Sequence, residues 1–423
     1  MMSLINQKER TAMEKLYGNA VVGQSGGPTA AINATLAGVI RGALAAAERG
    51  EIGKLYGMRN GIEGLCEERL VDLGKIFISE QRLRDLERTP AAALGSCRKR
   101  LPDPATDPQP FEYILDVFKK YDIRYFFYIG GNDSMDTVLK LRDYTARVGY
   151  EMRVIGVPKT IDNDLTHTDH TPGFGSAAKY VATSVKEILC DCAVYTTKAV
   201  TITEIMGRDA GWLTAAAALP RLSGGVAPDF VYLPEREFDM NAFFSDVRTA
   251  LKAHPNVVIA VSEGVKLPDG RYICEGLPGA KTDAFGHTQL SGTGTCLCTA
   301  LRTELGCKTR AVEFNTSQRC AAHIASGSDI RESVAIGKKA VEAALRGETG
   351  KMMCFVRSKT GYKITISSVD VAEVANQVRR VPDEFITPSG NNVTDKCLDY
   401  LRPLIEGEVR YRTEAGLPVH FKI

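Results

Sequence analysis

Apolar runs of strand length alternate with helical patterns along most of this chain, and that alternation limits its fold more than any other feature. The runs at 125–129 and 153–157 are each followed by a turn, and later comes a helical stretch at 174–188 whose apolar residues form one stripe. Parallel strands need long crossover connections, which are usually helices. The sequence therefore predicts an α/β fold with largely parallel sheets.

Composition excludes several classes of protein. The 53 basic and 51 acidic side chains nearly balance, so no overall field marks a nucleic-acid or membrane partner. No apolar run approaches the ~18–20 residues that a membrane span needs, and residues 1–17 lack the apolar centre of a signal peptide. Eleven cysteines without a CxxC pair, and only six histidines, argue against a disulfide framework or a zinc site. These features predict a soluble cytoplasmic protein with reduced thiols.

The loop at 158–164 places charged side chains directly after the apolar run at 153–157. Lys159, Asp162 and Asp164 thereby follow the carboxyl end of a predicted central strand, where open α/β sheets bind their ligands. A solvated turn is the competing interpretation, because Asp and Asn often form turns for local reasons. A functional interpretation depends on what else gathers at the same edge of the sheet.

Two glycine-rich turns also follow strand-like runs, at 23–28 and 130–134. Because glycine has no Cβ, such turns can bring backbone N–H groups close to an anion, and a following helix adds the positive end of its dipole. Neither turn has the spacing of a dinucleotide fingerprint or of a GK[ST] P-loop. They are candidate phosphate-binding loops, with ordinary strand-to-helix turns as the alternative.

Arginines supply candidate cations for the same region. Arg98 lies in a basic turn at 95–100, and Arg208 and Arg319 follow strand-like runs. A guanidinium can direct two N–H donors at one phosphate. A solvated surface arginine is the alternative for each of them.

Together these side chains match the needs of phosphoryl transfer. That reaction requires charge stabilisation, alignment and a base for the acceptor hydroxyl. Asp162 and Asp164 can divide this work, one as the base and the other as support for the base or for a magnesium–phosphate assembly. Glu263, at another strand end, suits a sugar hydroxyl.

Six motifs occur in the order and spacing that are typical of the phosphofructokinase family, which the chain resembles over about residues 18–345. They are Gly26-Gly27, Gly130-Gly131-Asn132-Asp133-Ser134, Thr160-Ile161-Asp162-Asn163-Asp164, Met206-Gly207-Arg208, Glu263-Gly264 and Gln318-Arg319. Chance agreement of all six is negligible. The resemblance implies two doubly wound, Rossmann-like lobes with mostly parallel sheets and an active-site cleft between them. It also implies fructose 6-phosphate as the acceptor.

The resemblance assigns roles to individual residues. Asp162 would activate the 1-hydroxyl of fructose 6-phosphate, with Lys159, Asp133 and Asp164 as further catalytic residues, and Mg²⁺ would be the cofactor, with Asn132 at the metal-linked position. The donor would be held by Gly26, Gly27, Arg98, Gly131 and Ser134. The sugar phosphate would be held by Thr160, Ile161, Asp162, Met206, Gly207, Arg208, Glu263, Arg310, Thr316 and Arg319. Arg310 resembles an arginine that a neighbouring subunit contributes, which implies a homodimer or homotetramer.

Two positions bear on the phosphoryl donor, because the family divides into ATP users and pyrophosphate users. ATP users have glycine at the positions of Asp133 and Lys159. Asp133 places a side chain and a negative charge where the α-phosphate of ATP would lie, and Lys159 brings a cation to the transferring phosphate. Both differences favour pyrophosphate as the donor in a reversible reaction that yields fructose 1,6-bisphosphate and orthophosphate.

Departures from the family pattern leave alternatives open. Asn132 replaces the usual aspartate, Asp209 stands where many relatives have histidine, Cys320 replaces a glycine and Ala199 replaces a second intersubunit arginine. The alternatives are an ATP-dependent 6-phosphofructokinase, a kinase of a longer ketose phosphate such as sedoheptulose 7-phosphate, and a non-catalytic regulatory member.

The 423 residues suffice for two or three domains, and the absence of a repeat or a low-complexity linker suggests that the domains exchange segments. The predicted phosphoryl-donor lobe comprises 18–175 with about 310–345. The predicted sugar-phosphate lobe comprises about 176–309 with 346–423, which includes a C-terminal extension. Frequent glycines predict a hairpin or mobile loop at 267–295.

Overall fold

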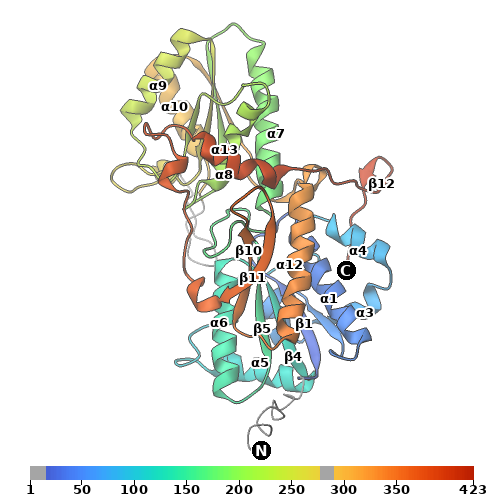
Figure 1. Cartoon of the computed structure of the whole chain (residues 1–423). Helices are drawn as coiled ribbons and strands as arrows, with labels where there is room; N and C mark the ends of the chain where they lie inside the picture. Colours follow the sequence, from blue (N-terminus) through green and yellow to red (C-terminus); the bar gives the residue numbers. More distant parts are fainter. Residues whose placement is uncertain (1–15, 277–289) are drawn as a thin grey trace, which may run out of the picture.

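The computed structural model describes residues 16–276 and 290–423, in which two main sheets form the centres of two lobes (Figure 1). The larger sheet has the strand order β11-β10-β5-β4-β1-β2-β3 in the described residues. Neighbours from β10 to β2 pair in parallel, and β11 and β3 join the two edges antiparallel. The strands are β1 (Asn19–Gln24), β2 (Leu55–Met58), β3 (Leu70–Asp72), β4 (Ile123–Gly130), β5 (Arg153–Pro158), β10 (Lys351–Arg357) and β11 (Ile364–Asp370).

The smaller sheet is entirely parallel in the described residues, in the order β7-β8-β6-β9. Its strands are β6 (Ala199–Ile205), β7 (Phe230–Tyr232), β8 (Asn256–Ser262) and β9 (Lys308–Glu313). A hairpin of β12 (Thr413–Glu414) and β13 (Leu417–Pro418) stands apart from both sheets near the C-terminus (Figure 1). Residues 277–289, which belong to the predicted hairpin or loop at 267–295, lie outside the described residues.

Helices cover both sheets, and none in the described residues is long and apolar enough to cross a membrane. The α-helices are α1 (Ile32–Glu48), α2 (Gly61–Cys66), α3 (Leu73–Ile76), α4 (Glu80–Glu87), α5 (Gln109–Lys120), α6 (Asn132–Arg147), α7 (Phe174–Ala193), α8 (Trp212–Ala215), α9 (Met240–Ala253), α10 (Thr293–Leu305), α11 (Ser317–Cys320), α12 (Gly327–Leu345) and α13 (Asp395–Leu401). Short 3-10 turns lie at Ala216–Leu222, Ile273–Gly276, Ala322–Ile324, Val371–Glu373, Asp383–Phe385 and Arg402–Ile405.

The larger sheet is wound on both faces, which explains its apolar strands. One face packs against α1 and α12, and the other packs against α2, α5 and α6. In β4 all residues except Arg124 are buried, because a parallel strand between two helical layers has no solvated face. The α/β prediction with mostly parallel sheets is therefore confirmed.

Sheet membership divides the chain differently from the predicted lobe ranges. β9 belongs to the smaller sheet, whereas β10 and β11 belong to the larger one. The reason is the buried apolar segment of β10, which pairs in parallel with β5 through Lys351 with Ile155 and Met352 with Gly156. The chain then returns to the smaller lobe with α13, and its C-terminus lies beside α3 and α4 (Figure 1).

Helices α1 and α12 cross at very short range. A Cβ on Gly38 would lie 2.2 Å from the carbonyl oxygen of Val334, and a Cβ on Gly337 would lie 2.2 Å from that of Thr35. Two glycines therefore let the two backbones touch, at the layer that covers the larger sheet. The crossing also fixes α12, which carries side chains that reach toward the loop after β5.

We expect Gly38→Ala or Gly337→Ala to lower the free energy of unfolding by about 1–3 kcal/mol, because the added methyl group must force the helices apart. Helix propensity alone would give the opposite sign, a gain of up to ~1 kcal/mol. Chemical and thermal unfolding of each variant measures the change. Gly74→Ala is the control, since its new Cβ would meet only side chains, at 3.3 and 3.6 Å. A variant at the crossing that is as stable as this control would contradict the interpretation.

Candidate active site

A cleft of about 680 Å³ lies between the carboxyl ends of strands from both sheets. The larger sheet contributes the loops that follow β1, β4 and β5, and the smaller sheet contributes those after β6, β8 and β9. Parallel α/β sheets place ligands at such strand ends. The cleft is therefore the candidate active site.

Most of the residues predicted from the sequence meet in this cleft. Those that line it are Gly26, Gly27, Arg98, Gly131, Asn132, Asp133, Ser134, Lys159, Thr160, Ile161, Asp162, Asp164, Met206, Arg208, Glu263, Thr316 and Arg319. Gly207 and Arg310 are not among the lining residues. Gly207 lies just behind the cleft, where its backbone N–H points to Oε1 of Glu263 at 3.4 Å.

The two aspartates reach the cleft because the chain turns sharply between them. Asn163 has a left-handed φ of 55°, and its buried side chain donates a hydrogen bond to the hydroxyl oxygen of Tyr400 at 3.1 Å. Asparagine tolerates this conformation better than most residues. Asp162 and Asp164, on either side, both line the cleft, and the backbone N–H of Asp162 donates to Oγ1 of Thr160 at 3.1 Å.

Lys159 is buried at the base of the cleft, and its Nζ donates to the carbonyl oxygen of Gly27 at 2.6 Å. A Cβ on Gly26 would lie 3.3 Å from that Nζ, and a Cβ on Gly27 would lie 3.2 Å from Nη1 of Arg319. The glycine turn therefore closes directly over two cations. Burial, opposed by Asp162 and Asp164, lowers the pKa of Lys159 to about 8.

Burial also raises the pKa values of carboxyl groups in the cleft. It raises the pKa of Asp162, against the effect of Lys159 and two arginines. Burial and then the neighbouring Asp162 raise the pKa of Asp164 to about 7, and burial raises that of Glu263 to about 8. Three carboxyl groups with raised pKa values beside several cations can take up and release a proton near neutral pH.

The loop after β4 begins α6 at Asn132 and puts Asp133 into the first turn of that helix. Oδ1 of Asp133 accepts a hydrogen bond from Nη2 of Arg100 at 2.9 Å. Arg100 lines the cleft as well, although it is not among the residues predicted from the sequence. Its position in the basic turn with Arg98 was the available signal. The ion pair connects the 95–100 turn to α6 at the cleft.

The loops of the smaller lobe pack tightly against each other. The backbone N–H of Met206 donates to Oε1 of Gln318 at 3.1 Å, and Gly207 has a φ of 145°. A Cβ on Gly264 would lie 2.0 Å from the carbonyl oxygen of Arg208. The residue pairs Met206-Gly207, Glu263-Gly264 and Gln318-Arg319 are thus packed together through their backbones.

Arg310 is placed elsewhere. It lies on β9, its side chain is 58% exposed, and its Nη1 is 3.7 Å from Oδ2 of Asp191. It borders a separate cavity of about 160 Å³ at the start of β6 and β9. Within one chain, therefore, Arg310 does not contribute to the cleft.

The candidate metal residue Asn132 is engaged by the C-terminal part of the chain. Its Oδ1 accepts from the backbone N–H of Asn376 at 2.6 Å, and its Nδ2 donates to the carbonyl oxygen of Gln377 at 2.7 Å. Asn376 and Val378 line the cleft, and no sequence pattern indicated them. The described residues contain no group of three or more His, Cys, Asp or Glu side chains that could hold a metal ion.

Comparison with known proteins gives a consistent result. The family model described as "Phosphofructokinase" matches residues 19–314. The chain is 42% identical to the pyrophosphate–fructose 6-phosphate 1-phosphotransferase of Halomonas elongata over 95% of this chain and 94% of that one. It is 40% identical to the protein of the same name from Methylococcus capsulatus, again over 95% and 94%.

Among solved structures, the pyrophosphate-dependent phosphofructokinase of Nitrosospira multiformis superimposes with a TM-score of 0.87 at 38% identity, over 96% of both chains. The match thus includes both lobes and the C-terminal segment that borders the cleft. By sequence and by fold, the chain belongs to the phosphofructokinase family.

Proposed function

We propose that this chain catalyses the reversible transfer of a phosphoryl group from pyrophosphate to the 1-hydroxyl of fructose 6-phosphate. The products are fructose 1,6-bisphosphate and orthophosphate. The observation that carries this proposal is the meeting of Asp162 and Lys159 with the Asp133–Arg100 pair in one cleft. The names of the two curated relatives and of the solved structure state the same donor or the same reaction.

Asp162 acts as the general base in this proposal. It accepts the proton of the sugar hydroxyl while that oxygen forms a bond to the terminal phosphorus, and the bridging P–O bond of pyrophosphate breaks. Lys159, Arg208 and Arg319 stabilise the charged form of Asp162. The same cations stabilise charge on the transferred phosphoryl group, which is the main task of enzymes of this type. Asp164 supports the base as a second proton-holding carboxyl group.

The donor side selects a short, highly charged substrate. Lys159 and Arg98 offer positive charge to pyrophosphate, and the Gly26–Gly27 backbone can approach it closely. The Asp133–Arg100 pair occupies the place where a nucleotide would continue from its β-phosphate. ATP would have to break this pair and lie against a carboxylate, whereas pyrophosphate ends before it.

Mg²⁺ is the proposed cofactor. The cleft fits an ion that arrives on pyrophosphate oxygens, because Mg²⁺ keeps several waters and needs few protein ligands. Asn132 would supply the protein oxygen, since Oδ1 has a second lone pair beside the one that faces Asn376. When bound, the ion neutralises charge on the phosphates.

The sugar phosphate lies against the smaller lobe in this proposal. Met206, Arg208, Glu263 and Arg319 line that side, with Thr316 beside them. The exposed Arg310 is then available to the 6-phosphate bound by a second copy of the chain, in a homodimer or homotetramer. We also propose the cytoplasm as the site of action, where both substrates would be found.

Asp162→Asn should lower kcat by about 10²–10⁴-fold while the KM for fructose 6-phosphate changes little, because the amide keeps the shape but accepts no proton. Steady-state kinetics with magnesium pyrophosphate measures both constants. Asp116→Asn, an exposed change on α5, serves as the control and should match the wild type. Near-normal turnover of Asp162→Asn would place the base at another residue.

The double variant Asp133→Gly with Lys159→Gly should lose most turnover with pyrophosphate and gain turnover with ATP. The carboxylate and the ion pair that exclude a nucleotide would be gone, and so would the cation for the shorter donor. Initial rates with each donor, in the wild type and the variant, decide the matter. Preference for ATP in the wild type, or unchanged use of pyrophosphate in the variant, would refute the assigned donor roles.

The pH profile of kcat/KM for pyrophosphate should fall on both sides of neutrality. Asp162 works as a carboxylate, and its pKa is raised, so activity is lost as the pH falls through that pKa. Lys159 works as a cation, and its pKa is lowered to about 8, so activity is lost above about pH 8. Rates between pH 5 and 10 at constant ionic strength test this, and a flat profile up to pH 10 would exclude Lys159 as the donor cation.

A further inference from the structure

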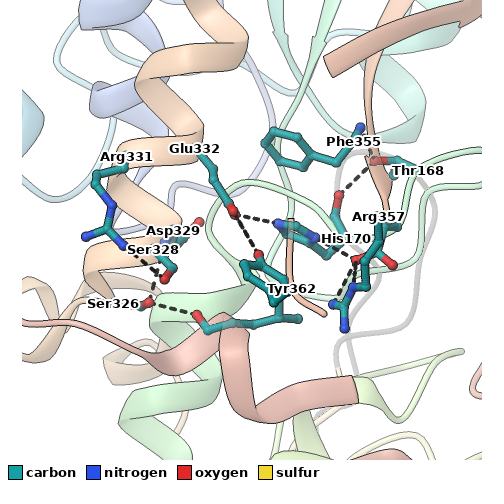
Figure 2. Close-up of polar contacts among 12 residues, drawn as sticks. Thr168, His170, Ser326, Ser328, Asp329, Arg331, Glu332, Phe355, Arg357 and Tyr362 are labelled. Atoms are coloured by element: carbon teal, nitrogen blue, oxygen red, sulfur yellow. Dashed lines mark hydrogen bonds and ion pairs between the residues drawn. The ribbon is translucent and has the colours of Figure 1, made fainter. Parts of the chain in front are cut away.

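A buried charge cluster lies behind the acidic loop and outside the cleft. His170 is 2% exposed, its Nδ1 lies 2.9 Å from Oδ1 of Asp169, and its Nε2 lies 2.8 Å from Oε2 of Glu332 (Figure 2). Phe355 of β10 stacks on the ring at 4.6 Å between centroids. None of these residues lines the cleft.

Both ring nitrogens of His170 face a carboxylate, and this geometry determines the charge of the ring. A neutral imidazole has one N–H and one lone pair, so one carboxylate would face a lone pair at less than 3 Å. The charged imidazolium donates to both. Burial opposes the charged form, but the hydrogen bonds to Asp169 and Glu332 outweigh it and raise the pKa of His170 above its ordinary value.

The surrounding groups complete the charge balance. Arg357 of β10 places Nη2 2.8 Å from Oδ1 of Asp169, and the hydroxyl of Tyr362 donates to Glu332 at 2.8 Å (Figure 2). Asp329, one turn before Glu332 on α12, accepts from the backbone N–H groups of Gly173 and Ser176. The charges of His170 and Arg357 offset those of Asp169 and Glu332, whereas the carboxyl group of Asp329 is held by these backbone N–H groups.

Two further groups reach the cluster from the C-terminal part of the chain. The carbonyl oxygen of Asp169 accepts from Nη1 of Arg379 and from the hydroxyl of Tyr400, each at 2.6 Å. The backbone N–H of Arg379 in turn donates to the carbonyl oxygen of Asp164 at 2.7 Å. Tyr400 also accepts the hydrogen bond from Asn163. The cluster is thus linked to the backbone on which both catalytic aspartates lie.

The loop between β5 and α7 folds back on itself, so the residues just before α7 hold the residues just after β5 in place. Thr160 pairs with Gly173 in a parallel bridge, and Oγ1 of Thr171 donates to the carbonyl oxygen of Thr160 at 2.8 Å. At the same far end, the backbone N–H of Asp169 donates to the carbonyl oxygen of Phe355 at 2.9 Å. A movement of residues 168–173 would therefore be transmitted to the strand end that carries Asp162.

We propose that His170, held between Asp169 and Glu332, is a positioning residue for phosphoryl transfer, which fixes the loop that carries Asp162 and Asp164 against α12 and β10. The identity of the reaction rests on the proposed function, whereas the structural link between His170 and the loop that carries Asp162 and Asp164 does not. The role of His170 depends on its charge, because only the doubly protonated ring donates a hydrogen bond to both carboxylates.

The pH dependence has a definite sign. The folded-state pKa of His170 lies above the unfolded value of about 6.5, so its contribution to stability is complete below about pH 6.5. That contribution disappears as the pH rises through the folded-state pKa. Glu332→Gln keeps an oxygen opposite Nε2 but removes its charge, so this variant should titrate His170 at a lower pH than the wild type.

The test compares His170→Gln and Glu332→Gln with Glu342→Gln, which makes the same chemical change on an exposed site of α12. His170→Gln should lower kcat at pH 7 by about 10- to 100-fold with little change in either KM, since the reacting groups are misplaced rather than lost. At low pH, the kcat of Glu332→Gln should be close to that of the wild type. As the pH rises, the kcat of this variant should fall at a lower pH than the kcat of the wild type. Glu342→Gln should follow the wild-type profile throughout.

An NMR titration of the imidazole Cε1–H signals gives a readout without turnover. The signal that is absent from His170→Gln identifies His170, and its midpoint should lie above 6.5 in the wild type and lower in Glu332→Gln. Superimposable kinetic profiles of Glu332→Gln and wild type, or a wild-type midpoint at or below 6.5, would overturn the proposal. The kinetic measurements use whichever phosphoryl donor the wild type accepts. A failure of pyrophosphate as the donor is therefore distinguished from a failure of the role assigned to His170.

Discussion

Charges removed from water must be balanced by other charges close by, and this constraint governs the arrangement around the loop after β5. Lys159, Asp162 and Asp164 share one poorly solvated site with Arg208 and Arg319. The cations and the carboxylates lower the cost of burying each other, whereas the like charges of Asp162 and Asp164 oppose each other, which helps to raise the pKa of Asp164. The three cations outnumber the two carboxyl groups, so the site can accept an anion such as phosphate, and the raised pKa values of Asp162 and Asp164 let it accept a proton.

Such a balance needs precise placement, and the fold provides it through backbone features rather than through long side chains. The glycine turn after β1 closes onto Nζ of Lys159, and Asn163 turns the chain in the left-handed conformation so that its two neighbours face the cleft. All of these residues follow directly on strands of a sheet whose two faces are covered. A rigid element holds a reacting group more accurately than a free loop does.

Much of this could be predicted because strand, turn and charged residue are adjacent in the sequence. The loops at 23–28, 130–134 and 158–164 each carry their own signal, and the order of β1, β4 and β5 then brings them together. The local sequence around Asn376, Val378 and His170 carried no such signal. Their places depend on β10 pairing with β5 and on the chain returning beside α6, which are contacts between segments about 200 residues apart. Local patterns do not contain that information.

The acidic residue in the first turn of α6 shows how selectivity and stability combine. The N-terminus of a helix after a glycine turn usually attracts a phosphate. Here Asp133 occupies that position and stabilises the helix dipole itself, while Arg100 pairs with its carboxylate. The dipole is thus used internally, and Lys159 and Arg98, which also line the cleft, carry positive charge that is available to an anion. In the proposed function, pyrophosphate uses these cations and ends before the Asp133–Arg100 pair, so that the pair and its interaction with the helix dipole stay intact when the donor binds.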